Sequence, residues 1–575
     1  MNPGSGVGRR PLENGEASMK SFENGVDRRR LLAGGAAIAG SLVLPWAARA
    51  DALSEAVEIE VAEGRLRGVR TGGVDAYKGV PYGDSVSGAN RFKPARPVAP
   101  WTGVRDATRL GAPTLQDPTT VYGLNEPAPG EDCLVLNVWT PAGGGPNGGK
   151  GKPVMFYSHG GGYTTGSGGS TAQDGSMLAR EHDVVVVAHN HRLGVLGYLY
   201  LGELGGAEYA GSGNQGLSDI VLALKWVQRN IAAFGGDPGN VTIFGESGGG
   251  AKTSCLYAMP SVAPLFSKAI IQSGPVVRIS TPDVAAQTTR FYLDLLGIAP
   301  ADWRKLLDVP APQVLAAQKA LLAKYPGDSG GWKGIQSLNP GSYGPIVDGG
   351  LLPHHPFDPT APASAAGKPL MIGWLDRETA FFSWQNKDIE AFRLDEAGLK
   401  ARLAPRLGDK TPMVIDALRA AHPGASPSDL YLTALSYHAM GAGSVVTAER
   451  KAAQGKAPVY VYNIAYRSNR KMDGTDIELG AMHASDIPLV FNTVASPKTL
   501  AGDRADRFEA ARNISAMWAN FARSGKPSAP GQPAWPAYDL KTRSTMVLDV
   551  ACSVVPDRFG AERKLWAQLD PAVSA

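Results

Sequence analysis

Short apolar runs alternate with segments of helical periodicity along this chain. Residues 153–158 (PVMFYS) and 183–188 (DVVVVA) are continuous and largely apolar, as is typical of strands that helices cover on both faces. Residues 217–234 carry apolar side chains at helical spacing, and the Gly-Gly-Asp-Pro sequence at 235–238 is expected to end that helix. Strands separated by helices predict a large, mostly parallel sheet with right-handed crossovers.

The same patterns predict the rest of an α/β domain. Further strands are expected at 241–245, 269–272, 370–373 and 459–462, and a hairpin at 57–69, where apolar and polar residues alternate about Gly64. The stretch 276–340 is helical but less regular, which favours a helical cap or side subdomain. A Gly- and Pro-rich surface loop is expected at 141–152. No internal repeat or interdomain linker is evident, so we expect residues 51–575 to form one domain.

Composition excludes several classes of protein. The 575 residues are 43% hydrophobic and 19% charged, which is enough apolar material for a large core and too little charge for a disordered chain. The 71 glycines show no Gly-X-Y period, so a collagen-like chain is excluded. The net charge of +4 is mild and shows no clustered basic stripe, which argues against nucleic-acid binding.

The N-terminus has the layout of a signal peptide. Arginines at 28–30 precede an apolar run at 31–44, and Pro45 and the small-x-small sequence Ala48-Arg49-Ala50 follow. The paired arginines resemble a twin-arginine (Tat) export signal. The run is shorter than the roughly 20 residues that span a bilayer, so an uncleaved anchor is the less favoured alternative. We therefore expect residues 1–50 to be removed and the mature chain to be periplasmic or secreted, with no stable membrane insertion. Met19 is a second candidate start.

Cysteines and paired histidines give little sign of a metal centre. The chain has three cysteines, an odd count that leaves at least one free, and none has metal-ligand spacing. His189 and His191 stand at i, i+2 near the end of a predicted strand, where two imidazoles could share a metal ion. No third ligand is evident, so no metal is expected.

The chemistry concentrates at one turn. Gly245-Glu246-Ser247-Gly248-Gly249 matches G-x-S-x-G and directly follows the predicted strand 241–245. This strand–turn–helix context is what the nucleophile elbow of a serine hydrolase requires, because the flanking glycines allow a sharp turn that exposes the serine. A Gly-rich turn without function is the alternative, and the preceding β-branched strand argues against it.

A glycine run follows another predicted strand. His159-Gly160-Gly161-Gly162 comes directly after 153–158 and matches the HGGG-type loop that supplies oxyanion-hole donors. Consecutive glycines expose backbone N–H groups and permit dihedral angles that a β-carbon would forbid. Such a run beside a serine elbow favours acyl transfer over a surface loop.

A serine nucleophile needs a base and an orienting acid. Several of the nine histidines are candidate bases, and His483 is favoured because it follows a turn-prone segment well after the elbow. The chain order Ser, acid, His leaves Asp348, Asp376 and Glu378 as candidate acids. Spacing alone does not choose among them.

Seven motifs in order make the chain resemble the type-B carboxylesterase/lipase family, which includes cholinesterases and bacterial para-nitrobenzyl esterases. They comprise the glycine loop, the elbow and five further segments at 77–82 (YKGVPY), 131–138 (EDCLVLNV), 190–194 (NHRLG), 213–219 (GNQGLSD) and 234–238 (FGGDP). The resemblance covers most of the mature chain and implies an α/β-hydrolase fold.

The resemblance also implies roles for particular residues. The segment 373–378 (GWLDRE) is similar to the family segment that carries the triad acid, which favours Glu378 over Asp376. His483 is similar to the family base, and Gly161, Gly162 and Gly248 would form the oxyanion hole. The chain departs from the family pattern at His191, where tyrosine is usual, at Gly250 and Lys252 after the elbow, and at Thr379. Thr114 stands where a disulfide partner of Cys133 would be expected.

We therefore expect a serine carboxylesterase that acts on small-molecule esters through an acyl-enzyme intermediate, without a metal or organic cofactor. A non-catalytic cholinesterase-like binding protein is the alternative, although such proteins typically lose the serine or histidine. A β-lactamase-like enzyme would need S-x-x-K, but Gly250 stands three residues after Ser247. Tyr163, Trp374 and Phe381 could line a pocket or belong to the core. Neither the natural ester nor the oligomeric state follows from the sequence.

Overall fold

The computed structural model describes residues 54–117, 126–143, 151–325 and 340–569. Residues Leu53–Ala575 form one compact unit. The expected leader, residues 1–50, lies outside the described residues, as does most of the Gly-rich loop expected at 141–152.

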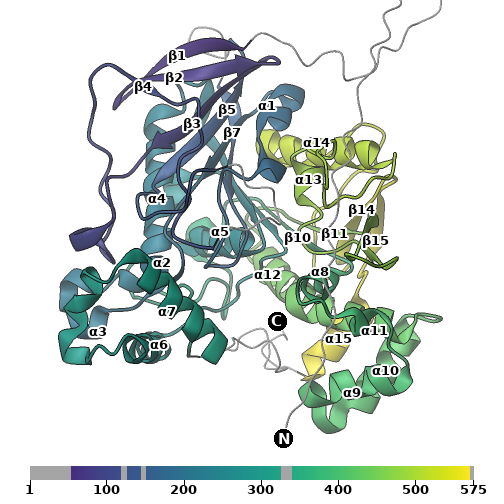
Figure 1. Ribbon diagram of the computed structural model, residues 1–575. Coiled ribbons are helices and arrows are strands. Elements are labelled where there is room, and N and C mark those ends of the chain that lie inside the picture. The colour runs from purple at the N-terminus through teal and green to yellow at the C-terminus, as the bar shows by residue number, and fades with distance from the viewer. Residues whose placement is uncertain (1–53, 118–125, 144–150, 326–339, 570–575) are drawn as a thin grey trace, which may run out of the picture. The chain divides into compact units, whose positions relative to one another are not determined.

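One thirteen-stranded sheet runs through the described part of this unit (Figure 1). Seven central strands are parallel, and antiparallel strands extend the sheet at both edges. In spatial order the strands are β1 (Glu55–Val61), β2 (Gly64–Thr71), β3 (Val74–Pro81), β5 (Val135–Pro141), β7 (Val185–His189), β6 (Lys152–Ser158), β8 (Gly236–Glu246), β9 (Lys268–Gln272), β10 (Leu370–Leu375), β11 (Val459–Ile464), β14 (Ser544–Leu548) and β15 (Ser553–Pro556), with β4 (Val104–Asp106) paired to β2. A separate two-stranded sheet joins β12 (Ser468–Lys471) and β13 (Glu478–Gly480).

The strand order creates a switch point beside β6. The chain passes from β6 outward to β7 and then returns to the other side of β6 to form β8. In open α/β sheets the crevice at the carboxyl ends of the strands on either side of such a reversal is the usual ligand site. The glycine loop, 159–162, follows β6 directly, and the elbow motif, 245–249, begins with the last two residues of β8.

Helices cover both faces of the sheet. On one face α5 (Gly248–Ala258) packs on β8 and β9, and α12 (Ala442–Ala453) packs on β10 and β11, with α4 (Gln215–Asn230) also on this side. On the other face α1 (Ser176–His182) packs on β5 and β7, and α14 (Arg507–Ser524) packs on β6 and β8 beside α13 (Ile487–Val490). The C-terminal helix α15 (Gly560–Leu569) packs near α12.

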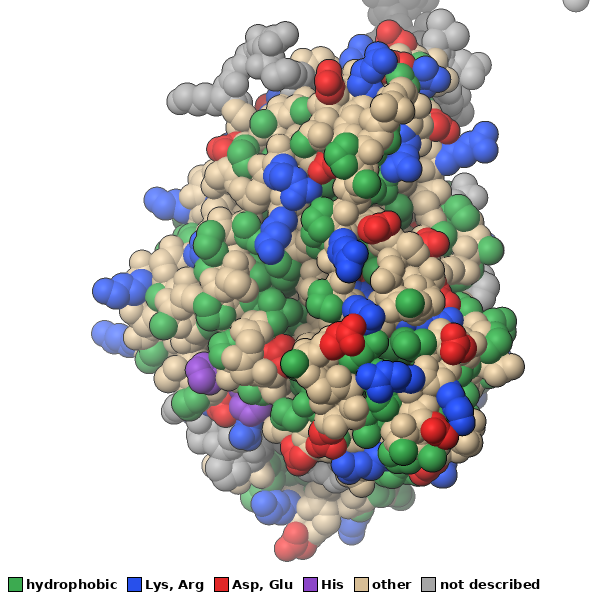
Figure 2. All heavy atoms as spheres, turned by 90° about the vertical axis from the view of Figure 1, so that its left-hand side faces the viewer, with side chains coloured by type: hydrophobic (Ala, Val, Ile, Leu, Met, Phe, Trp, Pro, Cys, Tyr) green, Lys and Arg blue, Asp and Glu red, His purple; other side chains and the backbone are tan. Residues whose placement is uncertain are grey.

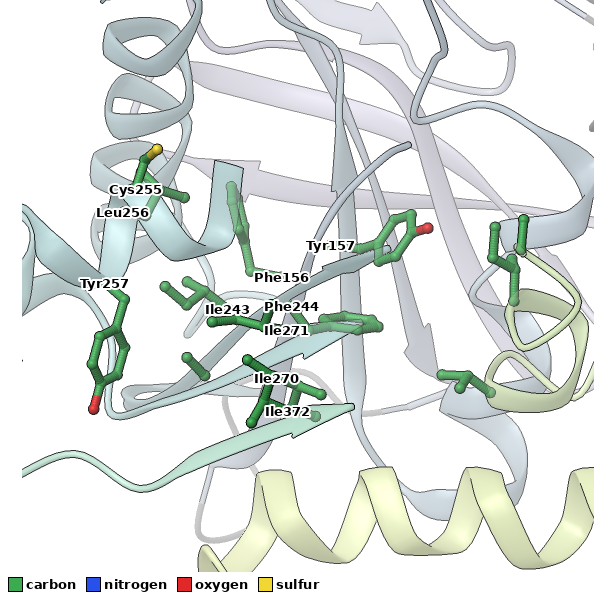
Figure 3. Close-up of a cluster of buried hydrophobic side chains, with 14 of the residues drawn as sticks. Phe156, Tyr157, Ile243, Phe244, Cys255, Leu256, Tyr257, Ile270, Ile271 and Ile372 are labelled. Atoms are coloured by element: carbon green, nitrogen blue, oxygen red, sulfur yellow. The ribbon is translucent and has the colours of Figure 1, made fainter. Parts of the chain in front are cut away.

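The core between these layers fixes the ends of β6 and β8 relative to each other. Phe156 and Tyr157 of β6 and Ile243 and Phe244 of β8 are at most 1% exposed. Phe156 and Ile243 face Leu256 of α5, whereas Tyr157 and Phe244 face the opposite side of the sheet (Figure 3). The Tyr157 and Phe244 rings lie 4.9 Å apart. Each such side chain contributes about 1.5–3 kcal/mol on full burial, so the two strands form a rigid base for the loops above them.

Two helical excursions leave the sheet. The first, predicted at 276–340, contains α6 (Pro282–Leu295), a 3-10 helix (Pro300–Leu307) and α7 (Ala311–Lys324), beside the short helices α2 (Gly194–Tyr198) and α3 (Gly202–Gly205). The second, between β10 and β11, was not predicted. It holds α8 (Glu378–Gln385), α9 (Glu396–Leu407), α10 (Thr411–Ala421) and α11 (Pro427–Ser436), which joins α12 through a π-helical turn (Tyr437–Gly441).

The predicted strands are all present, but some boundaries differ: β7 begins at Val185 rather than at 183, and β8 begins at Gly236 rather than at 241. The helix expected at 217–234 ends at Asn230, because Ile231 to Gly235 turn tightly and Gly236 already begins β8. The hairpin about Gly64 pairs Val61 with Gly64 as expected.

Charge is spread over the visible surface. On the face in Figure 2, basic and acidic side chains are interspersed, and neither sign forms a continuous stripe. Among the described residues, none of the helices has the length and hydropathy that a membrane span requires.

Candidate active site

Ser247 occupies a strained turn between β8 and α5. Its backbone has φ 56° and ψ −124°, a region that residues with a β-carbon rarely adopt. The neighbouring glycines are required by close packing: a β-carbon on Gly245 would lie 2.5 Å from the Gly249 carbonyl oxygen, and one on Gly249 would lie 1.9 Å from the Ser158 carbonyl oxygen. The turn therefore presses against the end of β6 and presents the serine side chain above the sheet.

Three side chains from distant parts of the chain meet at this turn. The Ser247 hydroxyl lies 2.7 Å from Nε2 of His483, and Nδ1 of His483 lies 2.6 Å from Oε2 of Glu378. The imidazole is 2% and the carboxylate 0% exposed. Glu378 begins α8 directly after β10, and His483 lies in the loop between β13 and α13. The structure thus brings together the three residues that the sequence nominated.

The Glu378 carboxylate is held on both sides. Its Oε1 accepts hydrogen bonds from the Ser273 hydroxyl at 2.6 Å and from the Leu375 backbone N–H at 2.8 Å, while Oε2 faces His483. The other two acid candidates lie elsewhere. Asp376 pairs with Arg558 at 3.2 Å, and Asp348 accepts from Asn214 at 2.8 Å. Of the three candidates, Glu378 is therefore the one that contacts His483.

The glycine loop lies against the start of α5. A β-carbon on Gly248 would approach the Gly162 backbone nitrogen to 2.4 Å, so only glycine allows these two backbones to meet. Gly161 and Gly162 have φ of 85° and 62°, which glycine adopts without strain. Backbone N–H groups of Gly161, Gly162 and Gly248 are thereby gathered beside Ser247 at a helix N-terminus, where partial positive charge accumulates.

Hydrogen bonds to successive carbonyls orient this loop. The His159 ring donates from Nδ1 to its neighbour, the Gly160 carbonyl, at 2.8 Å. Thr165 donates to the Gly161 carbonyl from its backbone N–H and from its hydroxyl, both at 3.1 Å. Because the C=O and N–H of a trans peptide point in opposite directions, these bonds turn the N–H groups of Gly161 and Gly162 away from the clamped side.

Two buried carboxyl groups act on the His483 imidazole. Burial lowers the pKa of His483, but the charges of Glu246 and Glu378 outweigh burial and raise that pKa to about 9. Glu246 lies 3.3 Å from Nε2. Burial also raises the pKa of Glu246 well above the ordinary glutamate range. The hydrogen bond to Nδ1 comes from Glu378, at 2.6 Å.

Several supporting residues were not predicted. Glu246 is the second residue of the elbow motif, and Ser273 directly follows β9, so both stood at carboxyl ends of predicted strands. Beneath them the Gln272 side chain donates to Asp486 at 2.6 Å and accepts from Trp518 at 3.0 Å. Burial raises the pKa of Asp486 to about 6. Glu246 and Ser273 could have been found as polar residues at the ends of predicted strands. No local sequence pattern identifies Trp518.

The remaining histidines serve other purposes. His189 and His191 are buried, and the His191 ring stacks on His159 at 4.7 Å between centroids. Within the described ranges no cluster of histidine, cysteine or carboxylate side chains could hold a metal ion. Cys133, Cys255 and Cys552 are all free thiols.

The three candidate aromatic residues differ in position. Tyr163, next to Gly162, lines a cavity of about 180 Å³ together with Val276 and Tyr343. The buried Phe381 ring lies 5.6 Å from the His483 ring, whereas Trp374 packs in the core against Phe559. Phe381 therefore borders the site, and Tyr163 lies beside the glycine loop.

Comparison with known proteins identifies the family of this chain. Residues 54–563 match the sequence profile described as the Carboxylesterase family. The para-nitrobenzyl esterase of Bacillus subtilis is 33% identical over 87% of this chain and 96% of its own length. The liver carboxylesterase of Sus scrofa is 32% identical over 89% of this chain and 92% of its own length.

Solved structures similar to this chain also include a carboxylesterase. The carboxylesterase EST55 of Geobacillus stearothermophilus aligns with a TM-score of 0.75 and 37% identity, covering 88% of this chain and 99% of that one. The expected family and fold class are therefore confirmed. This chain belongs to the carboxylesterase family, has the α/β-hydrolase fold and is a serine-type hydrolase of carboxylic esters.

Proposed function

We propose that Ser247, His483 and Glu378 hydrolyse a small carboxylic ester in two acyl-transfer steps. The observation that carries the proposal is the continuous hydrogen-bonded chain from the Ser247 hydroxyl through both ring nitrogens of His483 to Glu378, at 2.7 and 2.6 Å. A serine alcohol is a weak nucleophile alone, and this arrangement supplies the base and the orienting acid that it needs.

In the first step the Ser247 oxygen attacks the ester carbonyl while Nε2 of His483 takes the hydroxyl proton. Glu378 accepts the Nδ1 proton in a hydrogen bond, which fixes the tautomer and stabilises the imidazolium. The carbonyl oxygen becomes negative and accepts hydrogen bonds from Gly161, Gly162 and Gly248. Each such donor is worth about 3 kcal/mol in the transition state.

Collapse of this intermediate releases the alcohol, which takes its proton from His483. Water then attacks the acyl-serine with His483 again as base, and the carboxylic acid leaves as Ser247 regains its proton. These side chains and amides supply the nucleophile, the proton transfers and the charge stabilisation, so the proposed reaction needs no metal or organic cofactor.

Replacement of the nucleophile tests the proposal. Ser247→Ala should lower the kcat for para-nitrophenyl butyrate by about 10⁶-fold and abolish labelling by a fluorophosphonate. Ser254→Ala is the matched control, because Ser254 is a buried serine of the same helix whose hydroxyl donates to the Gly274 carbonyl. Ester hydrolysis by Ser247→Ala at the wild-type rate would refute the assignment. Unlabelled and inactive wild-type protein would favour a binding protein instead.

The comparisons suggest where to begin with substrates. The Bacillus subtilis relative is named for para-nitrobenzyl esters, so we propose that this chain also accepts esters of simple aromatic alcohols. A series of para-nitrophenyl esters of increasing acyl length, with one para-nitrobenzyl ester, would define both sides of the pocket.

We also propose that the chain is exported through the Tat pathway and acts in the periplasm or outside the cell. The support is the arrangement of residues 28–50: paired arginines, an apolar run and a small-x-small cleavage sequence. Replacing Arg28 and Arg29 with lysine should retain the precursor in the cytoplasm. Normal export of that variant, with cleavage after Ala50, would argue against the Tat route.

A further inference from the structure

A buried lysine lies one helical turn beyond the elbow. Lys252 of α5 is 0% exposed, and its Nζ donates to the His159 carbonyl at 3.1 Å. No carboxylate forms an ion pair with it in the described part of the chain. The Tyr163 ring lies beside it, with 6.0 Å between Nζ and the centroid. An ammonium group has three donors, so this contact uses only a third of its capacity.

The groups around Lys252 do not compensate its charge. His159, His189 and His191 are buried, and burial together with the Lys252 charge lowers the pKa of all three imidazoles, that of His189 to about 3. Burial lowers the pKa of Lys252 itself to about 7. A methionine would fill the same space without this desolvation cost. A polar side chain kept in such a place at a cost in stability is typical of a functional site.

The hydrogen bond that Lys252 donates lies at the start of the oxyanion loop. Its Nζ holds the His159 carbonyl, the His159 ring holds the Gly160 carbonyl, and Thr165 holds the Gly161 carbonyl. Three successive peptide planes are thereby fixed, and the last two carry the N–H groups of Gly161 and Gly162.

Lys252 also links the two parts of the oxyanion hole. It stands four residues after Gly248 on α5, so both lie on one face of the same helix. The glycine loop supplies the N–H groups of Gly161 and Gly162, and the helix supplies that of Gly248. The hydrogen bond from Lys252 to the His159 carbonyl joins the loop to the helix.

We propose that Lys252 is a positioning residue that locks the oxyanion loop onto helix α5. This inference rests on the proposed function, since it assigns Lys252 to the same reaction. Without the lysine, the Gly161 and Gly162 N–H groups would lose their alignment with the Gly248 N–H at the developing oxyanion. Substrate binding, which does not require that alignment, would persist.

The test is Lys252→Met, measured with substrate and with an aryl trifluoromethyl ketone. Ser247 adds to the ketone carbon, the carbonyl electron pair moves to oxygen and the serine proton moves to His483, so the adduct places an oxyanion in the hole. We expect kcat to fall about 10- to 100-fold, with KM changed by less than about threefold, because misalignment weakens transition-state stabilisation. The Ki of the ketone should rise by the same factor as kcat falls.

Lys451→Met is the matched control. Lys451 is also buried, with its pKa lowered to about 8 by burial, and it donates to the Ala365 and Ala366 carbonyls far from the elbow in sequence. It should lose stability while keeping kcat and Ki. Active sites are counted by fluorophosphonate titration, so that kcat refers to folded protein.

Lys252→Gln, which retains a shorter donor, is the second variant if Lys252→Met does not fold, and we expect it to lose kcat and ketone affinity together in the same way. Unchanged kcat and Ki in a folded variant would overturn the proposal, as would failure of both variants to fold while Lys451→Met folds. A wild-type protein without esterase activity would instead refute the proposed function.

Discussion

Two clusters of buried charge lie close together along this chain and are built differently. Arg192 and Asp219 form an ion pair with side chains 1% and 0% exposed. Asp219 accepts from the backbone N–H, Nε and a terminal nitrogen of Arg192 at 2.7–3.0 Å, and the other terminal nitrogen donates to the Lys93 carbonyl. This pair combines opposite charges and several hydrogen bonds, as buried charges require for stability.

The cluster around Ser247 departs from that pattern. Glu246 has no lysine or arginine partner within the described ranges, Lys252 has no carboxylate partner, and Ser247 has a strained backbone. Both Glu246 and Lys252 respond to burial with pKa shifts toward their neutral forms. Buried charged groups without an oppositely charged partner therefore lie close to Ser247, where they can serve catalysis rather than stability.

The largest expected effect is a loss of turnover when the acid that contacts His483 is neutralised. Glu378→Gln keeps the shape of the acid but removes its charge, so kcat should fall about 10³- to 10⁴-fold. Loss of the carboxylate also removes one cause of the raised His483 pKa. Because the neutral imidazole is the active base, the acid limb of kcat/KM should move to lower pH. Stopped assays across pH would measure both effects.

Asp376→Asn is the control for that prediction. Asp376 lies two residues away on the same loop but pairs with Arg558, so kcat should be close to that of the wild type. If Glu378→Gln kept wild-type turnover, Glu378 would not be the triad acid.

Breaking the buried ion pair of Arg192 and Asp219 should lower stability instead of turnover. Asp219→Asn leaves the buried Arg192 without its counter-ion, and the free energy of unfolding should fall by about 3–5 kcal/mol. The kcat of the folded fraction should change by less than about threefold, since surface and structural changes act mainly on stability. Urea denaturation and titrated activity measure the two quantities separately.

The exposed pair of Asp302 and Lys305, whose side chains are 51% and 68% exposed, provides the control. Asp302→Asn should cost less than about 1 kcal/mol. A similar loss in both variants would show that burial of the Arg192 pair has no special weight.

The buried Lys252 should make stability depend on pH. Its pKa is about 7 in the folded chain and near 10.5 when unfolded. Between these values the unfolded chain binds more protons, so stability rises with pH and is lost as pH falls toward 7. The unfolding free energy of the wild type minus that of Lys252→Met should therefore rise by about 1.4 kcal/mol per pH unit from pH 7.5 to 9.5.

The groups that face Lys252 should not obscure this slope. The pKa values of His159, His189 and His191 are lowered by burial, and burial raises that of Tyr163 well above 10, so in the folded chain none titrates within this window. A pH-independent difference between the two proteins would mean that Lys252 keeps an ordinary pKa.

The smallest expected effect concerns backbone strain at Ser247. Glycine adopts φ 56°, ψ −124° readily, whereas alanine does not. Ser247→Gly should therefore be more stable than Ser247→Ala by about 1 kcal/mol, although both are inactive. Thermal unfolding of the two proteins side by side would show whether the elbow stores strain; equal melting temperatures would show that it does not.

Much of the fold followed from local pattern because each central strand is buried on both faces. The β-branched run of β7 and the strand before Ser247 were recognisable from composition alone, and so was the hairpin about Gly64. The helices α8 to α12 were missed, although Leu399, Leu403 and Leu407 of α9 are buried at helical spacing. That segment interrupts the alternation of strand and helix, so no simple architectural rule places it.

Part of the site could likewise be predicted from local sequence, and part could not. Ser247 and the glycines stand in motifs whose spacing is local, and could be found from the sequence. The choice of Glu378 over Asp376 required resemblance, because both follow the same strand and only the three-dimensional turn decides which carboxylate faces His483. Ser273 and Trp518 act through contacts across the sheet, which no local pattern encodes.

The most direct test of the central claim is covalent trapping of the nucleophile. After treatment with diethyl para-nitrophenyl phosphate, intact-mass measurement and peptide mapping should find one diethylphosphoryl group per chain, on Ser247, with activity lost in proportion to labelling. Ser247→Ala should remain unlabelled. Labelling at another residue, or full esterase activity in a chain modified at Ser247, would contradict the account.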